Sequence, residues 1–195
     1  MLEVIDIEAS GLGSASYPIE VGIALADGSQ HSWLIRPVTE WEHWCDQAQK
    51  VHGISREQLL EEGYSVQQVC EALNDLCGAR DLHTDCWVYD NSWLHLLYVT
   101  AGIRQTFSLS PIERVLDEES LDDYSAYKKY AQRLLAIAPH RAGSDAKIIQ
   151  TALSMLTHRP QPSSVAAFKP RHINFTQTKA GRHGTHRVNS ASFNY

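Results

Sequence analysis

Residues 4–25, VIDIEASGLGSASYPIEVGIAL, decide the fold that the sequence predicts. β-Branched residues alternate over 2–7 and recur over 19–27, which is typical of strands, and the Gly- and Ser-rich run between them is typical of a loop. Asp27-Gly28 then predicts a hairpin turn into a third strand over 30–37. The sequence therefore predicts a three-stranded antiparallel meander over residues 2–37.

The rest of the pattern mixes helices with short strands. Helical spacing predicts helices over residues 40–51, 65–77, 93–102, 121–138 and 146–158. Short apolar runs predict strands over residues 83–89 and 106–110. This order of elements predicts an α/β fold in which helices flank one central mixed sheet of about five strands. The run RPQPSS predicts a boundary, with one domain over 1–158 and a tail or arm over 159–195.

Charge is divided unevenly along the 195 residues, whose net charge is −6. All 23 acidic residues lie at or before Asp145, whereas residues 146–195 contain seven Lys or Arg and no acid. A basic tail beside an acidic body is compatible with a polyanionic partner such as nucleic acid. A solvated tail that offsets the charge of the body explains the same pattern, so both interpretations stay open.

The sequence predicts a cytoplasmic protein without a membrane segment. It contains no run of about 18 apolar residues and no signal-peptide layout at its N-terminus. The four cysteines form no CxxC pair, which favours reduced thiols.

Asp6 and Glu8 are two acids in a run that otherwise reads as a buried strand. Residues i and i+2 of a strand face the same side, so both carboxylates are predicted to project together. Two like charges so close raise a pKa unless a cation neutralises them. Taken alone, the pair is explained by a salt bridge to Arg or Lys, or by a strand end open to water.

Three further residues bear on the same chemistry. Asp90 ends the strand predicted over 83–89, and Asp145 begins the last predicted helix. His140 precedes Asp145 by five residues, which is about 500° on a helix, so the two side chains converge only if His140 lies in the preceding loop. Separately, Asp145 is explained as a partner of the helix dipole and His140 as an exposed loop residue.

Together, these side chains predict a metal site. Carboxylate oxygens suit Mg²⁺ or Mn²⁺, and two such ions about 3.5–4 Å apart can clamp a phosphoryl displacement. Asp6, central on the first strand, is the candidate to bridge both ions. His140 is the candidate proton acceptor for an attacking water, because the pKa of histidine lies near operating pH.

The same motifs, in this order, resemble the DEDDh 3′–5′ exonucleases of the DnaQ-like, RNase T-like group in the RNase H-fold superfamily. The resemblance covers roughly residues 2–158. It rests on VIDIEASGLGSASYPIEVGIAL (4–25), HGISREQL (52–59), VYDNSWLHLL (88–97) and HRAGSDA (140–146).

This resemblance implies an RNase H-like fold and a two-metal exonuclease that removes nucleoside 5′-monophosphates from single-stranded 3′ ends. It implies that Asp6, Glu8 and Asp145 hold one Mg²⁺ or Mn²⁺ ion, and that Asp6 and Asp90 hold the second. It implies His140 as general base.

The resemblance also implies substrate contacts. Leu12 matches the position of an apolar wedge against the terminal base, although ordinary loop packing explains it equally. Ala9 follows the two acids where a Thr is common in the family. Arg141 follows the predicted base and is a candidate to contact a phosphate or to hold the helix start.

The second motif departs from the family pattern, because the frequent His-Asn-x-x-Phe-Asp form is absent. Alignment of that form on Asn91 would put His95 in the place of the acid, and Asp85 is a less suitable substitute. We prefer Asp90, whose Tyr-Asp form favours RNA slightly over DNA. A non-catalytic nucleic-acid-binding module or accessory subunit remains the alternative, and a homodimer remains open as the oligomeric state.

Overall fold

The computed structural model describes residues 1–158, so the predicted boundary after 158 and the predicted basic arm over 159–195 lie outside the described residues. The strands are β1 (Val4–Ala9), β2 (Pro18–Ala24), β3 (Gln30–Leu34), β4 (Asp81–Thr84) and β5 (Ser108–Pro111). The helices are α1 (Asp46–His52), α2 (Arg56–Glu62), α3 (Val66–Cys77), α4 (Trp87–Ala101), α5 (Glu118–Leu135) and α6 (Ala142–Thr157). None of these helices is long and apolar enough to cross a membrane.

The predicted mixed sheet is confirmed, with strand order β3-β2-β1-β4-β5. β1, β2 and β3 pair antiparallel as the predicted meander, and β4 and β5 add in parallel. The predicted turn joins β2 to β3: Gly28 adopts φ +92°, and the Leu25 N–H donates to the Ser29 carbonyl at 2.9 Å. A positive φ of this size is easily adopted only by glycine.

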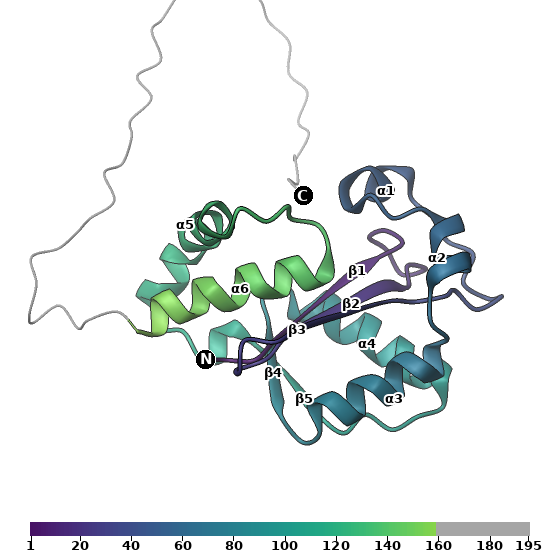
Figure 1. The fold of residues 1–195 in the computed structure, drawn as a ribbon, viewed down its shortest axis with the longest axis horizontal. Coiled ribbons are helices and arrows are strands. Elements are labelled where there is room, and N and C mark those ends of the chain that lie inside the picture. Colours follow the sequence, from purple (N-terminus) through teal and green to yellow (C-terminus); the bar gives the residue numbers. More distant parts are fainter. Residues whose placement is uncertain (159–195) are drawn as a thin grey trace, which may run out of the picture. The chain divides into compact units, whose positions relative to one another are not determined.

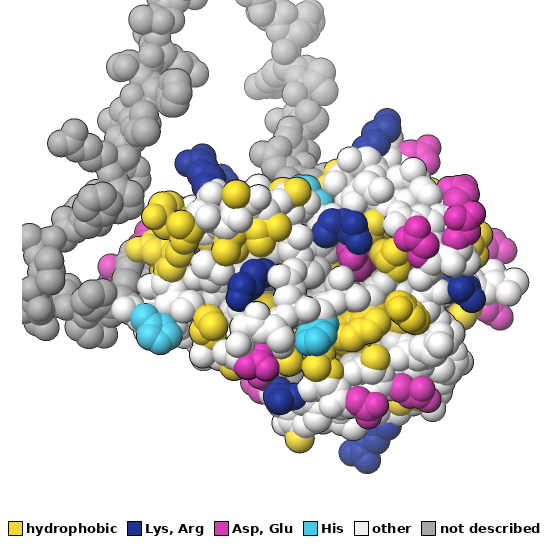
Figure 2. Space-filling model, viewed as in Figure 1, with side chains coloured by type: hydrophobic (Ala, Val, Ile, Leu, Met, Phe, Trp, Pro, Cys, Tyr) yellow, Lys and Arg dark blue, Asp and Glu magenta, His cyan; other side chains and the backbone are white. Residues whose placement is uncertain are grey.

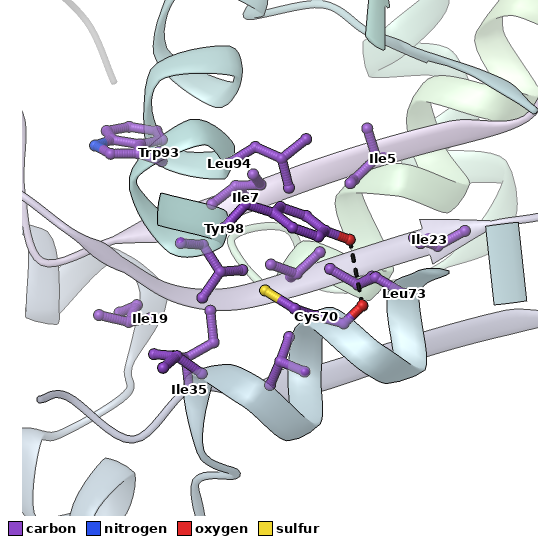
Figure 3. Packing of buried hydrophobic residues seen from close by; sticks show 14 of the residues in the cluster. Ile5, Ile7, Ile19, Ile23, Ile35, Cys70, Leu73, Trp93, Leu94 and Tyr98 are labelled. Atoms are coloured by element: carbon purple, nitrogen blue, oxygen red, sulfur yellow. Dashed lines mark hydrogen bonds between the residues drawn. The ribbon is translucent and has the colours of Figure 1, made fainter. Parts of the chain in front are cut away.

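Helices cover both faces of the sheet (Figure 1). α5 and α6 lie on one face, and α3 and α4 lie on the other. Ile5 and Ile7 of β1 pack with α3 and α4 in the larger core, part of which is drawn in Figure 3. Tyr98 closes that core by donating its hydroxyl hydrogen to the Cys70 carbonyl at 3.3 Å. Val4 packs on the opposite face, with Ile149 and other apolar residues of α6.

The start of α6 lies directly on β2 at Gly22. A Cβ added at Gly22 would stand 2.0 Å from the Ala142 carbonyl carbon and 2.1 Å from the Gly143 nitrogen. Only a residue without a side chain permits this approach. Gly22 is the register partner of Asp6 on β1, so the contact brings the α6 N-terminus over the part of β1 that carries the two acids.

The strand predicted over 83–89 is confirmed only over 83–84, as the end of β4, and is wrong beyond Thr84. β4 ends at Thr84, and α4 begins at Trp87. Thr84, the last residue of β4, pairs with Pro111 of β5, and proline has no backbone N–H to extend the pairing. Residues 87–89 are apolar but exposed, so their strand propensity is overridden by their position on a helix start. Asp90 therefore lies in the first turn of α4 and not at a strand end.

Other boundaries differ by smaller amounts. The helix predicted over 40–51 exists only as α1, and α2 was not predicted as a helix. The predicted end of α4 is confirmed, since Gly102 follows it with φ +67°. α5 begins at Glu118 and α6 begins at Ala142, both before their predicted starts at 121 and 146. Asp145 therefore lies inside the first turn of α6.

Candidate active site

The two acids of β1 project from one face of the strand, as their spacing predicts, and this is the face that α6 covers. Val4 packs against α6 from the same face, and Ile5 and Ile7 alternate with the acids toward the opposite core. Glu8 lies close to the start of α6, where its carboxylate is near ligand atoms of His140 and Asp145. Alternation along β1 thus separates the hydrophobic core from the candidate site.

His140 and Asp145 are brought together as the spacing argument requires. His140 lies in the loop before α6 with φ +65°, and Asp145 lies in the first turn of the helix. The His140 backbone N–H donates to Asp145 Oδ2 at 2.9 Å. One ligand atom each from Glu8, His140 and Asp145 lies within 4.8 Å of the others. These three residues can therefore surround one small cation.

Asp90 joins this group from the first turn of α4. Its carboxylate is only 1% exposed and accepts a hydrogen bond from the Thr84 hydroxyl. Burial and then the nearby Asp90 charge hold the pKa of Asp6 well above its usual range. His95, the alternative residue for the second motif, is exposed farther along α4. The structure thus brings Asp90, and not His95, to Asp6.

The acids of the site repel one another. Burial and then the charge of Asp145 raise the pKa of Glu8 from 4.5 to about 7. Burial also raises the pKa of Asp90 and of Asp145 above the usual range. Carboxylates held together at this cost are the hard oxygen donors that Mg²⁺ and Mn²⁺ prefer. The residues present therefore fit a divalent metal site.

Glu20 of β2 is a site residue that the sequence argument missed. It is 1% exposed and accepts hydrogen bonds from Arg141 Nε at 2.9 Å, Arg141 Nη2 at 2.8 Å and the Ala142 backbone N–H at 3.0 Å. Glu20 therefore satisfies a backbone donor at the start of α6, which has no partner within the helix. The available signal was a single acid, Glu20, in the apolar run IEVGIAL (19–25), but the sequence did not indicate which residue it contacts.

Arg141 contacts Glu20 through its guanidinium group. Its guanidinium is held by two parallel hydrogen bonds to Glu20, which fix the residue between His140 and the helix. The predicted role in holding the helix start therefore has a geometric basis. The predicted contact with a phosphate stays a prediction.

A second ion pair borders the acids. Lys128 Nζ of α5 lies 2.5 Å from Asp85 Oδ2, and the Tyr124 hydroxyl donates to the same oxygen at 2.7 Å. Asp85 lies between β4 and α4, next to Thr84. From the sequence, Asp85 was a candidate only as a substitute ligand, and Lys128 and Tyr124 were not identified. Their spacing of four is typical of a shared helix face, but nothing local indicated which segment that face meets.

The other predicted substrate contacts lie just beyond Glu8. Leu12 is 51% exposed in the loop between β1 and β2, whereas Ala9 is buried at the end of β1. The loop is tied to α4 because Trp93 Nε1 donates to the Ser16 hydroxyl at 2.9 Å. Leu12 is thus an accessible apolar side chain on an anchored loop, and the contacts predicted for Leu12 and Ala9 stay predictions.

No family model matches this sequence, and no curated protein is similar to it in sequence. Solved structures are similar to it in fold. E. coli Exonuclease I in complex with a 5cy-dT13 oligonucleotide aligns with a TM-score of 0.62 at 12% identity, over 83% of this chain and 41% of that chain. The chain has a fold similar to that of Exonuclease I.

Two further structures support this exonuclease fold. A moderately thermophilic Exonuclease I from Methylocaldum szegediense aligns with a TM-score of 0.54 at 13% identity, over 79% of this chain and 40% of that chain. A product-bound exonuclease I aligns with a TM-score of 0.56 at 12% identity, over 79% of this chain and 43% of that chain. This chain thus spans less than half the length of these proteins. The predicted resemblance is confirmed for the RNase H-like fold.

Proposed function

We propose that this protein is a metal-dependent exonuclease that removes nucleoside 5′-monophosphates from the 3′ ends of single-stranded nucleic acids. One observation carries the proposal: β1, α4 and the start of α6 gather Asp6, Glu8, Asp90, His140 and Asp145 within an exonuclease fold. Structures with that fold include Exonuclease I in complex with a dA16 oligonucleotide, which supports single strands as the substrate class.

In this proposal, Asp6, Glu8 and Asp145 hold one Mg²⁺ or Mn²⁺ ion, and Asp6 and Asp90 hold a second. The bound ions supply Lewis acidity and charge stabilisation for phosphodiester hydrolysis. The buried carboxylates favour this use, because burial and then the charges of neighbouring acids raise their pKa values, and a bound cation would stabilise their ionised forms. Asp6, flanked by the other acids, is the residue placed to serve both ions.

His140 takes the proton of the attacking water in this proposal. Its backbone is fixed by the hydrogen bond to Asp145, and its ring lies beside Glu8. An imidazole is a suitable base because its ordinary pKa lies near neutral pH. Leu12 and Ala9 would line the terminal nucleotide, and Arg141 would lie near its phosphate. A homodimer and a cytoplasmic location remain predictions of the sequence.

The direct test is digestion of RNA and DNA oligonucleotides of matched sequence, each labelled at the 5′ end. With Mg²⁺ or Mn²⁺, we expect stepwise shortening from the 3′ end and release of nucleoside 5′-monophosphates, with no reaction in excess chelator. The Tyr-Asp motif favours RNA as the better substrate, so initial rates on the two series are compared. Binding of both series without shortening in either metal would contradict the proposal and support the non-catalytic binding module.

The acids also predict how metal and pH act on folding. In metal-free protein, stability should fall as pH rises from 4.5, the ordinary pKa of glutamate, through about 7, the pKa of Glu8. Over this range the folded state retains a proton that the unfolded state has lost, so stability decreases by up to about 1.4 kcal/mol per pH unit for each such group.

Thermal unfolding measures this dependence. We expect the Tm of metal-free protein to fall across the range, and added Mg²⁺ or Mn²⁺ to raise it most at the upper end, where the carboxylates are ionised. Glu8→Gln removes one titrating group, so its Tm should depend less on pH than that of the wild type. A metal-free Tm that increases with pH would contradict the electrostatic description of the site.

A further inference from the structure

We propose that Lys128 binds a backbone phosphate of the single strand at the edge of the acid cluster, and that Asp85 and Tyr124 hold its ammonium group in position. The inference rests on the proposed nuclease function and adds a substrate contact to it. Lys128 is here a substrate-binding residue, and Asp85 and Tyr124 are positioning residues.

The first step is geometric. Tyr124 and Lys128 lie four residues apart on α5, so their side chains share one helix face. Both contact the same oxygen of Asp85, at 2.7 Å and 2.5 Å. Asp85 follows Thr84 directly, and the Thr84 hydroxyl donates to the buried carboxylate of Asp90. Asp85 and its neighbour Thr84 therefore link the ammonium group of Lys128 to Asp90, a predicted metal ligand.

The electrostatics agree with this placement. Burial opposes the charge of Lys128, but Asp85, Asp6 and Asp145 together raise its pKa above the ordinary value. In return, the charge of Lys128 partly offsets the burial that raises the pKa of Glu8. Lys128 therefore stays charged, and its charge acts on residues of the site from β1 and α6 as well as on Asp85.

The balance of charge in the acid cluster favours one further positive charge, which the ammonium group of Lys128 supplies. Five carboxylates act on one another in this cluster: Asp6, Glu8, Asp85, Asp90 and Asp145. Two divalent cations would neutralise four of these charges and leave one. Lys128 supplies the remaining positive charge, so an incoming phosphate would meet a neutral site. Without Lys128, the same phosphate would meet a net negative site and be repelled.

Lys128 is also accessible to a ligand. Its side chain is 36% exposed, whereas that of Asp85 is 12% exposed. Asp85 takes one of the three ammonium hydrogens, which leaves donors for an anion. Arg141, a second cation that acts on Glu8, is instead engaged by both oxygens of Glu20. Lys128 therefore offers a cation beside the acids with donors left for a phosphate, whereas Nε and Nη2 of Arg141, whose side chain is 45% exposed, are occupied by Glu20.

The face of the described residues seen in Figure 2 shows no broad basic patch. Lys and Arg side chains are scattered singly on it, and acidic side chains gather toward α2. Residues 1–145 carry 23 acids against 10 Lys or Arg. Because residues 1–145 as a whole repel a polyanion, an approaching single strand gains attraction from an individual phosphate contact at the site.

The experiment measures binding of a fluorescent oligothymidylate whose 3′ linkages are phosphorothioates, so that it is not consumed. Fluorescence anisotropy gives the association constant in Mg²⁺ at increasing NaCl. Removal of one phosphate contact should make the slope of log K against log salt shallower by about 0.7 for a single strand. We expect this change in Lys128→Met. Lys128→Arg should retain the wild-type slope, because it retains the charge.

Lys129→Met is the matched control, since Lys129 is the exposed neighbour on the same helix and loses the same charge. It should retain the wild-type slope. Asp85→Asn should keep the slope but weaken binding, because the ammonium group remains charged and loses its anchor. Circular dichroism and the Tm confirm that each variant is folded, and Lys128→Gln replaces Lys128→Met if that variant is not.

The outcomes separate this inference from the proposed function. Equal slopes for folded Lys128→Met and Lys129→Met would show that Lys128 only ties α5 to the β4–α4 connection, and would overturn the inference even if the wild type digests oligonucleotides. A shallower slope for Lys128→Met in a wild type without digestion would support the phosphate contact and contradict the nuclease. A wild type that binds no oligonucleotide would overturn both.

Discussion

Asp6→Asn is expected to reduce metal-dependent digestion by a factor on the order of 10³ or more. The substitution preserves shape but removes one negative charge from the centre of the acid cluster, where Asp90, Asp145 and Glu8 all act on Asp6. A metal ion contributes several kcal/mol of charge stabilisation to such a reaction, and each 1.36 kcal/mol is about tenfold in rate. The initial rate of nucleotide release from a labelled single strand measures the loss.

Asp81→Asn is the matched control for this prediction. Asp81 lies at the opposite end of β4 from Thr84, where its carboxylate accepts hydrogen bonds from Ser108 and Ser110. Its digestion rate should remain that of the wild type. The Tm of metal-free Asp6→Asn should equal or exceed the wild-type value, because the amide relieves repulsion. Full digestion by a folded Asp6→Asn protein would exclude Asp6 as a metal ligand.

Gly22→Ala should damage both the fold and the site. The added methyl group would lie 2.0 Å from the Ala142 carbonyl carbon, so α6 must move away from β2. Overpacking of this kind costs roughly 1–3 kcal/mol, or about 2–4 °C in Tm per kcal/mol for a chain of this size. Displacement of α6 separates His140 and Asp145 from Glu8, and a shift of about 1 Å can cost on the order of 10²-fold in rate.

Gly28→Ala distinguishes the loss of stability from the loss of the site. Gly28 has φ +92° in the β2–β3 turn, and a Cβ there would meet open space. Alanine in that conformation costs on the order of 1 kcal/mol without touching α6. We therefore expect a lower Tm with a wild-type digestion rate. A Gly22→Ala protein with the same combination would show that the contact of α6 with β2 does not position the site.

Much of the site was predictable because its signals are local. Alternation along the first strand predicted that Asp6 and Glu8 project together, and the structure confirms this, on the face opposite Ile5 and Ile7. A separation of five residues required His140 to precede the helix that holds Asp145, and this is also confirmed. In both cases backbone periodicity fixes the relative direction of side chains that are close in sequence.

Asp90 was placed correctly in the cluster but on the wrong element. The apolar run over 83–89 has strand propensity, and its burial pattern was not readable from the sequence. Pairing of Thr84 with Pro111 ends β4, and the exposed residues that follow begin α4. The pairing of β4 with β5 therefore overrode the local strand propensity of residues 85–89. The Asp90 carboxylate is buried from the first turn of α4 instead.

The sequence by itself determined that a mixed sheet forms, that the two β1 acids share a face, and that His140 precedes the helix that holds Asp145. Only the tertiary structure decided that Glu20 accepts a hydrogen bond from the start of α6 and that α6 packs closely on Gly22. It also decided that Lys128 forms an ion pair with Asp85. Periodicity specifies which side of an element a residue occupies, because that depends on backbone geometry. It does not specify which distant segment lies opposite, because that depends on how whole elements pack.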